Sequence, residues 1–209
     1  MPDALPEAAV YIVTSLDGYV AREDGGLDGL PGFAAGEDYG YAASMATVDA
    51  LVMSRHPYET VRSFDAWPNG ETRVVVLSHC GVDVPEALRR TVAVRADEPA
   101  DVLHGLGPEG VRRVYLDGGR TTQGFLRGGL VTEMVLTRVP ALPGSGIPTF
   151  GPPGGDVRLQ HVETEASPGG LVQSRYRVAP GPSRGQSGRP PTRRGGAGDP
   201  VGAVGAPRE

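Results

Sequence analysis

Residues 114–126 of this chain read VYLDGGRTTQGFL, a short apolar run that stops at two glycines and resumes with helical spacing. A buried strand, a glycine turn and a helix N-terminus in this order direct free backbone N–H groups at one point, which suits a phosphate. Glycine favours such a turn because a Cβ atom would hinder close approach of the backbone to a ligand. The stretch indicates a nucleotide site, with an ordinary strand-to-helix turn as the alternative.

The segments before this stretch alternate in type. Short continuous apolar runs are typical of strands covered on both faces, and helix-like segments lie between them. This alternation predicts a mainly parallel sheet flanked by helices. The apolar runs are residues 8–13, 50–53, 74–77 and 114–116, and the helix-like segments are residues 38–46, 85–90 and 99–106.

The last third of the foldable chain has a different pattern. Residues 132–139, 157–163 and 170–178 alternate apolar and polar side chains, as half-exposed antiparallel strands do. The predicted fold class is therefore α/β, with three layers: a mainly parallel central sheet flanked by helices and closed by an antiparallel C-terminal hairpin.

Composition divides the 209 residues into a body and a tail. Residues 179–209 are rich in Gly, Pro and Arg and contain no aromatic side chain, so we expect a disordered tail after a single domain over residues 1–178. The tail holds five arginines against two acids, so the body is more acidic than the whole chain, whose net charge is −5. An acidic body argues against a nucleic-acid-binding domain.

Other classes of protein are excluded by single residue types. All twenty basic side chains are arginine, which rules out Schiff-base chemistry on lysine. The single cysteine, Cys80, allows neither an intramolecular disulfide nor a cysteine-based zinc cluster, and we expect no metal. No apolar run approaches about 18 residues, and residues 1–9 lack the features of a signal peptide. We expect a cytoplasmic protein without a membrane partner.

Polar side chains follow each of the four apolar runs. Ligands of open α/β sheets bind beyond the carboxyl ends of the strands, so these side chains are expected to meet at one edge and hold a dinucleotide. Taken singly, each has an ordinary structural role as its alternative: Ser54 and Ser78 as helix N-caps, Arg55 as a surface cation and His79 as a partly buried spacer. The candidates are Asp17 after the first run, Ser54, Arg55 and His56 after the second, Ser78 and His79 after the third, and Gly118, Gly119, Arg120 and Thr121 after the fourth.

From Ala8 to Val178 the chain resembles the dihydrofolate-reductase-like fold family, specifically the C-terminal reductase domain of bacterial riboflavin biosynthesis. The resemblance depends on several motifs in order at family spacing. They are SLDGYVA at residues 15–21, MSRHPYE at 53–59, WP at 67–68, VLS at 76–78, DGG at 117–119 with Thr122, FLRGGLVTE at 125–133 and PALPGSGIPTF at 140–150.

The resemblance implies a stand-alone reductase that uses NADPH and neither flavin nor metal. By the same resemblance, Ser54, Arg55 and His56 lie at the turn that grips the cofactor phosphates, and Ser78 and His79 line the pocket of the adenosine 2′-phosphate. The pyrophosphate is assigned to residues 118–121, which are Gly118, Gly119, Arg120 and Thr121. An apolar cleft for the nicotinamide is expected beside Tyr11, Val13, Leu27, Phe33 and Tyr41.

The resemblance places Asp17 beside nicotinamide and substrate, where it would orient the substrate or relay a proton. An ordinary turn residue before Gly18 is the alternative. The expected reaction is hydride transfer to a small polar carbonyl, imine or heterocycle, with 5-amino-6-(5-phosphoribosylamino)uracil as the first named substrate. A non-catalytic nucleotide-binding protein or a structural homodimer is the alternative, and the resemblance implies a homodimer in each case.

Two residues depart from the family motif Gly-Arg-x-Thr-Tyr/Trp-Glu. Ser54 replaces its glycine, and Pro57 replaces the threonine whose hydroxyl and N–H help bind phosphate. Because proline has no N–H, these departures predict weaker or altered cofactor binding.

Overall fold

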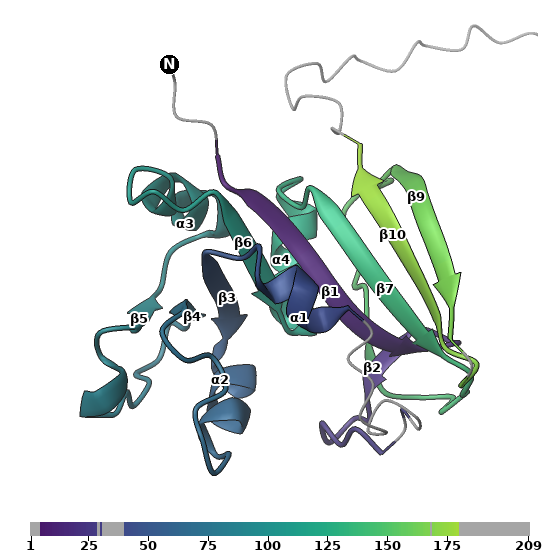
Figure 1. Ribbon diagram of the computed structural model, residues 1–209, viewed down its shortest axis with the longest axis horizontal. Helices are drawn as coiled ribbons and strands as arrows, with labels where there is room; N and C mark the ends of the chain where they lie inside the picture. The colour runs from purple at the N-terminus through teal and green to yellow at the C-terminus, as the bar shows by residue number, and fades with distance from the viewer. Residues whose placement is uncertain (1–4, 29, 31–39, 168, 180–209) are drawn as a thin grey trace, which may run out of the picture.

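The computed structural model describes residues 5–28, 30, 40–167 and 169–179. Most of its strands form one eight-stranded sheet in the order β5-β4-β3-β6-β1-β7-β10-β9 (Figure 1). Strands β2 and β8 form a separate two-stranded sheet. The strands are β1 (Glu7–Ser15), β2 (Tyr19–Ala21), β3 (Ala50–Ser54), β4 (Arg73–Leu77), β5 (Val92–Arg95), β6 (Arg113–Asp117), β7 (Glu133–Val139), β8 (Ile147–Pro148), β9 (Leu159–Ala166) and β10 (Val172–Val178). The helices are α1 (Tyr41–Met45), α2 (Arg55–Arg62), α3 (Pro99–Leu106) and α4 (Gly119–Arg127), with a 3₁₀ turn, η1, at Glu86–Leu88.

The six strands from β5 to β7 are parallel to their neighbours, and β10 and β9 are antiparallel. Helices α3 and α4 contribute to the core on one face of the sheet, and α2 contributes to the core on the other. This arrangement confirms the expected mainly parallel sheet between helical layers, closed by an antiparallel hairpin.

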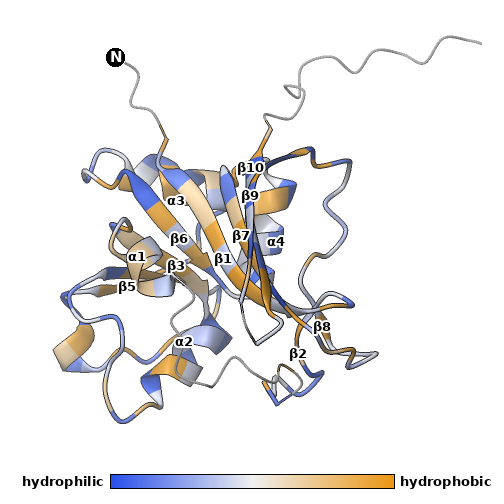
Figure 2. Cartoon of the chain, turned by 45° about the vertical axis from the view of Figure 1, so that its right-hand side comes forward, coloured by the Kyte–Doolittle hydropathy of each residue, from blue (hydrophilic) through white to orange (hydrophobic). Residues whose placement is uncertain are grey.

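Apolar side chains on both faces of the central strands explain why they form. Along β3, Val52 packs against the α3 and α4 side while Leu51 and Met53 pack on the α2 side, because successive residues of a strand point to opposite faces. The central strands are accordingly hydrophobic along most of their length in Figure 2. Tyr58 of α2 and Phe125 of α4 are fully buried on the two faces, which fixes both helices against the sheet.

The register places a step at the carboxyl edge of the sheet. Strand β1 pairs with β6 only from Glu7 to Val10, whereas it pairs with β7 from Ala9 to Ser15. Beyond Val10, the backbone of β1 therefore continues without a β6 neighbour. The sheet is open at this step, beside the start of α4.

Several elements differ from those predicted. Strand β5 was not predicted, because only Val92 of its four residues is buried and its apolar signal is short. Residues 85–90 form only a 3₁₀ turn, and the predicted strand at residues 157–163 is displaced to Leu159–Ala166. The helix predicted at 38–46 is confirmed over Tyr41–Met45, whereas residues 38 and 39 lie outside the described part of the chain.

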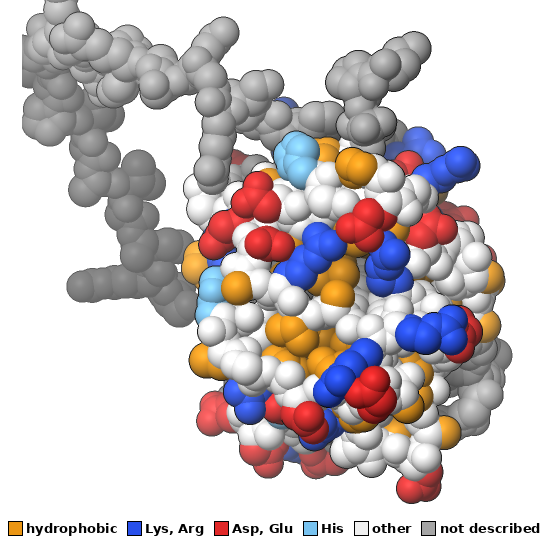
Figure 3. Space-filling model, turned by 90° about the vertical axis from the view of Figure 1, so that its left-hand side faces the viewer, with side chains coloured by type: hydrophobic (Ala, Val, Ile, Leu, Met, Phe, Trp, Pro, Cys, Tyr) orange, Lys and Arg blue, Asp and Glu red, His pale blue; other side chains and the backbone are white. Residues whose placement is uncertain are grey.

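On the face viewed from the β5 side, Figure 3 shows arginine and acidic side chains interspersed over the described residues. None of the helices in the described ranges is both long and apolar enough to cross a bilayer. The same residues include no group of three or more His, Cys, Asp or Glu side chains suited to a metal ion. The tail from residue 180 onward lies outside the described residues, so its disorder stays a prediction.

Candidate active site at the carboxyl edge

The parallel strands bring the predicted site residues to one edge of the sheet. Strand β3 lies between β4 and β6, with Ser54 opposite Leu77 and Met53 opposite Asp117. The turn at Ser78, the start of α2 and the start of α4 therefore follow one another along this edge. Asp17 follows β1, on the far side of β6.

The turn into α4 requires glycine at Gly118. This residue has φ +86°, which side-chain-bearing residues rarely adopt, and a Cβ atom there would lie 2.7 Å from Cγ of Pro57. At Gly119, in contrast, the nearest atom to a Cβ would be the Pro148 carbonyl oxygen at 3.7 Å, an ordinary contact. Within the protein, a Cβ at Gly119 would make only ordinary contacts, so the expectation that it would intrude on a bound ligand stays a prediction.

The contact between Pro57 and Gly118 brings together the first turns of α2 and α4. Free N–H groups at two helix N-termini favour a negatively charged ligand between them. Pro57 is the third residue of α2 and contributes no N–H, so the donor set on that side is smaller.

The first turn of α4 contains two buried hydroxyl groups, those of Thr121 and Thr122. Neither Oγ1 atom has a hydrogen-bond partner among the described residues. A buried hydroxyl without a partner costs about 1–3 kcal/mol, so a ligand oxygen reaching this turn would stabilise it. Arg120, in the same turn, is exposed.

The first turn of α2 carries Arg55 and His56, both exposed. The Arg55 Nε donates a hydrogen bond to Glu59 Oε1 at 2.6 Å, and this contact raises the pKa of Arg55 above its ordinary value. The His56 Nε2 lies 3.3 Å from the position of a Cβ at Gly25, so the imidazole faces the loop after β2. Ser54, the N-cap residue of α2, makes no side-chain capping hydrogen bond, contrary to its alternative interpretation as a cap.

The turn after β4 is stabilised by the side chain of Ser78, which hydrogen-bonds the backbone of Cys80. Ser78 Oγ donates to the Cys80 carbonyl at 2.8 Å and accepts from the Cys80 N–H at 3.2 Å. His79, beside it, is exposed. The Ser78 hydroxyl is thus used within the protein in this structure.

Asp17 joins two loops at the edge. Its Oδ1 accepts from the Ser15 hydroxyl at 2.6 Å, and its Oδ2 accepts from the Gly144 N–H at 2.9 Å. These contacts, the Ser15 hydrogen bond foremost, hold the pKa of Asp17 below its ordinary value. The ionised Asp17 carboxylate thus links the turn after β1 to the loop that contains Gly144. Its catalytic role stays a prediction.

Asp117, at the end of β6, was quoted within the glycine motif but not predicted as a site residue. Burial raises the pKa of its carboxyl group, and the Gly118 N–H opposes this only in part. The signal that could have identified it is its position, the last residue of a buried strand before the glycine turn. It is the second carboxyl at this edge, with a pKa shift opposite to that of Asp17.

Three tyrosines line the sheet face next to the step. Tyr41 of α1 makes edge contacts with Tyr11 and Tyr115, at ring-centroid distances of 5.6 and 6.3 Å. The Tyr115 hydroxyl donates to the Tyr11 carbonyl oxygen at 2.9 Å. The predicted cleft residues Tyr11 and Tyr41 are thus together, whereas Phe33 lies outside the described residues.

Two surface cavities lie away from this edge. One, of about 390 Å³, lies beside α1 over β7 and β10 and contains Arg113, Glu133 and Arg175. The other, of about 410 Å³, contains Leu126 and Leu159. Neither lining contains a predicted site residue. The candidate site is therefore the edge at which the parallel strands end, and neither of these cavities.

The comparisons with known proteins agree with the fold. The sequence model described as the RibD C-terminal domain matches residues 8–173. The chain belongs to the RibD C-terminal domain family. The dihydrofolate-reductase-like fold expected from the sequence motifs is thereby confirmed.

Two similar proteins differ in how closely they match this chain. A putative riboflavin biosynthesis protein from Shewanella sp. PV-4 has a solved structure with 36% identity and a TM-score of 0.76, covering 83% of this chain and 99% of its own. The uncharacterized protein YwjB of Bacillus subtilis (strain 168) is 29% identical over 147 residues, which is 69% of this chain and 82% of that protein.

The match to a more distant solved structure supports only a common fold. The diaminohydroxyphosphoribosylaminopyrimidine deaminase/5-amino-6-(5-phosphoribosylamino)uracil reductase of Thermotoga maritima has 14% identity and a TM-score of 0.66. The match covers 84% of this chain but 57% of that longer protein.

Proposed function

We propose that this protein is an NADPH-dependent reductase that transfers hydride to a small polar carbonyl, imine or heterocyclic substrate. The observation that carries this proposal is the step between β1 and β6, which opens beside the start of α4 and close to that of α2. A dinucleotide can there place its phosphates at the helix ends and its nicotinamide in the step.

The residues present fit such a cofactor. The α4 turn at Gly118, Gly119, Arg120 and Thr121 would hold the pyrophosphate, and Arg55 and His56 would hold phosphate from the α2 side. The two unpartnered threonine hydroxyls support an oxygen-rich ligand at this turn. NADPH, when bound, supplies the hydride.

The chain's own residues perform the remaining tasks in this proposal. Tyr11, Tyr41 and Tyr115 form an aromatic cluster that would lie against the nicotinamide on one face of the step. Asp117, whose pKa is raised by burial, holds a proton more readily than an exposed carboxyl and would donate it to the reduced substrate. Asp17 would orient the loop beside the substrate through Ser15 and Gly144.

The first substrate to test is 5-amino-6-(5-phosphoribosylamino)uracil or its dephosphorylated form, because the Thermotoga relative is named for this reductase activity. Oxidation of NADPH, followed by absorbance with a panel of such heterocycles and simple carbonyl compounds, tests the proposal. We expect substrate-dependent oxidation that Asp117→Asn reduces. Tight NADPH binding without turnover on any of these substrates would favour the alternative, a non-catalytic nucleotide-binding protein.

We also propose that the protein is a cytoplasmic homodimer. Strand β9 supports the dimer, because it is the edge of the sheet and exposed along its whole length. Light scattering would measure the mass in solution, and a monomeric mass would contradict this proposal. A structural homodimer without cofactor binding is the remaining alternative, and a lack of NADPH binding would favour it.

A further inference from the structure

Arg55 was assigned to the cofactor phosphates and Ser78 to the adenosine 2′-phosphate. The pairing of Ser54 with Leu77 places the start of α2 beside Ser78, so Arg55 is also within the 2′-phosphate corner. Both side chains are engaged by neighbouring residues. The Arg55 Nε donates to Glu59, one helical turn further along α2, and the Ser78 hydroxyl donates to the Cys80 carbonyl. A phosphate arriving between them would meet a hydroxyl already in use and a guanidinium already beside a carboxylate. The charge on Arg55 is thus balanced before any cofactor binds.

Near Arg55 and Ser78, the negative charge of Glu59 affects the binding of a phosphate more than the engaged Ser78 hydroxyl does. A phosphate monoester carries close to two negative charges at neutral pH, so the Glu59 carboxylate repels it. A ribose 2′-hydroxyl is uncharged, and it can donate a hydrogen bond to a carboxylate. The side chains of Arg55 and Glu59 are 50% and 41% exposed, so their ion pair is weak enough for a ligand to separate.

We infer that Glu59 competes with the cofactor's 2′-phosphate for Arg55 and is a specificity-determining residue that narrows the preference for NADPH over NADH. This inference rests on the proposed reductase function. Removal of the carboxylate charge at position 59 is therefore expected to strengthen binding of 2′-phosphorylated ligands only.

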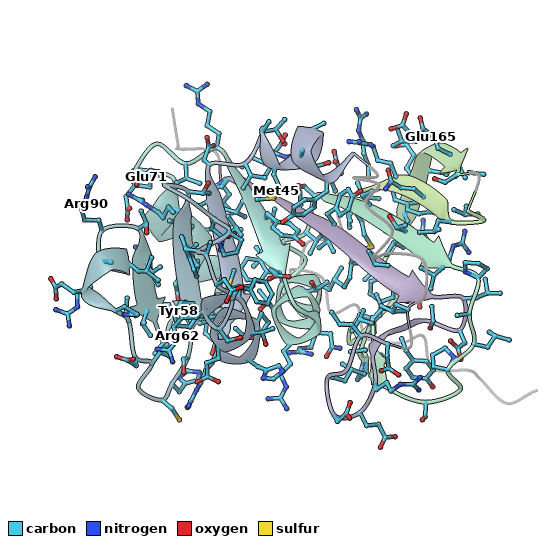
Figure 4. All side chains as sticks on the ribbon, turned by 60° about the horizontal axis from the view of Figure 1, so that its bottom comes forward. Met45, Tyr58, Arg62, Glu71, Arg90 and Glu165 are labelled. Carbon is cyan, nitrogen blue, oxygen red and sulfur yellow. The ribbon has the colours of Figure 1, made fainter. Side chains whose placement is uncertain are left out.

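The chain offers a matched control on the same helix. Arg62 of α2 pairs with Asp83 at 2.7 Å, also near the surface. Figure 4 labels Arg62 next to Tyr58, whose hydroxyl donates to the Asp83 backbone carbonyl. Asp83→Asn removes a carboxylate from an α2 ion pair and keeps that carbonyl, so it reports the general effect of losing such a pair.

The experiment is calorimetric titration of wild type, Glu59→Gln and Asp83→Asn with NADPH, NADH, adenosine 2′,5′-bisphosphate and adenosine 5′-monophosphate. We expect Glu59→Gln to bind the two 2′-phosphorylated ligands about tenfold more tightly, the Coulomb effect of one carboxylate near a doubly charged phosphate at water-like dielectric constant. The other two ligands and the Asp83→Asn variant should stay within about twofold of wild type. The gain should shrink at high salt and disappear in an Arg55→Gln background.

Melting curves verify that each variant is folded before titration. Unchanged or weaker binding of the 2′-phosphorylated ligands by folded Glu59→Gln would overturn the inference, because Glu59 would then be neutral or would hold Arg55 in place for the phosphate. The proposed function would survive that result as long as wild type binds NADPH. A folded wild-type protein that binds none of the four ligands would overturn both.

Discussion

The parallel strands and the C-terminal hairpin belong to one sheet but are buried to very different degrees. In β4, Val74, Val75 and Val76 are completely buried, whereas every residue of β9 is exposed. Helices cover the parallel strands on both faces, and this fixes where their carboxyl ends lie. The candidate site is therefore positioned by the parallel strands, whereas the hairpin presents an exposed surface.

The hairpin is attached through polar contacts as well as through its strand pairing. Glu133 of β7 accepts hydrogen bonds from Arg113 of β6 and from Arg175 of β10, and Arg175 also bonds to Glu163 of β9. Ion pairs at a surface contribute little individually, typically about 0–1 kcal/mol. The hairpin is therefore expected to tolerate substitutions that the parallel strands do not.

The largest expected effect is on stability, from the same substitution in the two regions. Leu116→Ala in β6 removes a side chain that is 1% exposed and should lower the free energy of unfolding by about 2–5 kcal/mol. Leu159→Ala in β9, where the side chain is 42% exposed, should change it by less than about 0.5 kcal/mol. Urea denaturation measures both. Equal losses would show that the hairpin is as integral to the core as the parallel strands.

The next effect distinguishes the two glycines at the end of β6. Gly118→Ala should cost about 1–3 kcal/mol from backbone strain, with the clash against Pro57 in addition, and should weaken NADPH binding by displacing the α4 turn. Gly119→Ala should leave the protein folded and no less stable, since alanine favours helices. Denaturation and cofactor titration of both variants test this. A destabilised Gly119→Ala would show that its neighbours leave less room than the geometry indicates.

The buried parallel strands were predictable because a continuous run of β-branched apolar residues, such as the three valines of RVVVL at residues 73–77, favours a strand that is covered on both faces. The C-terminal hairpin was predictable from its alternation, although β9 starts two residues later than predicted. What the sequence could not reveal is the pairing of polar groups. The motif around Arg55 contains Glu59, but only the helix places the two side chains one turn apart. Likewise, only the fold shows that Asp117 is partly buried. The Pro57 contact that makes Gly118 obligatory joins two separate motifs.

A smaller effect is expected at Pro57, on the site rather than on the fold. Pro57→Thr restores an N–H and a hydroxyl at the third position of α2, where the proposed cofactor would meet them together with the α4 turn. One added hydrogen bond is worth about 0.5–1.5 kcal/mol, so NADPH should bind about twofold to tenfold more tightly. Fluorescence titration measures the dissociation constant, with Thr60→Ser on the same helix as a control. Weaker binding by a folded Pro57→Thr would show that the proline contact with Gly118 matters more than the missing donor.

The smallest effects concern Asp117 and Asp17, the two carboxyls at the edge. Their contributions to the stability of the protein should change with pH in opposite directions. The pKa of Asp117 is raised by burial, so its contribution to stability is present below the ordinary aspartate pKa and is lost as pH rises through the raised value. The pKa of Asp17 is lowered by Ser15, so its contribution is present above the ordinary value and is lost as pH falls through the lowered one.

Melting temperatures of wild type, Asp117→Asn and Asp17→Asn, measured from about pH 3 to about pH 8, separate the two cases. At neutral pH, Asp117→Asn should melt above wild type, because asparagine replaces a carboxyl whose ionisation is disfavoured by burial, and Asp17→Asn should melt below it. Both differences should shrink as the pH falls, that of Asp117→Asn at the higher pH, because the pKa of Asp117 is raised and that of Asp17 is lowered. A stabilised Asp117→Asn that also loses turnover would mean that the chain retains a costly buried carboxyl for its chemistry. If Asp117→Asn is instead destabilised at neutral pH, the carboxylate is held by favourable contacts and cannot serve as the proton donor of the proposed reaction.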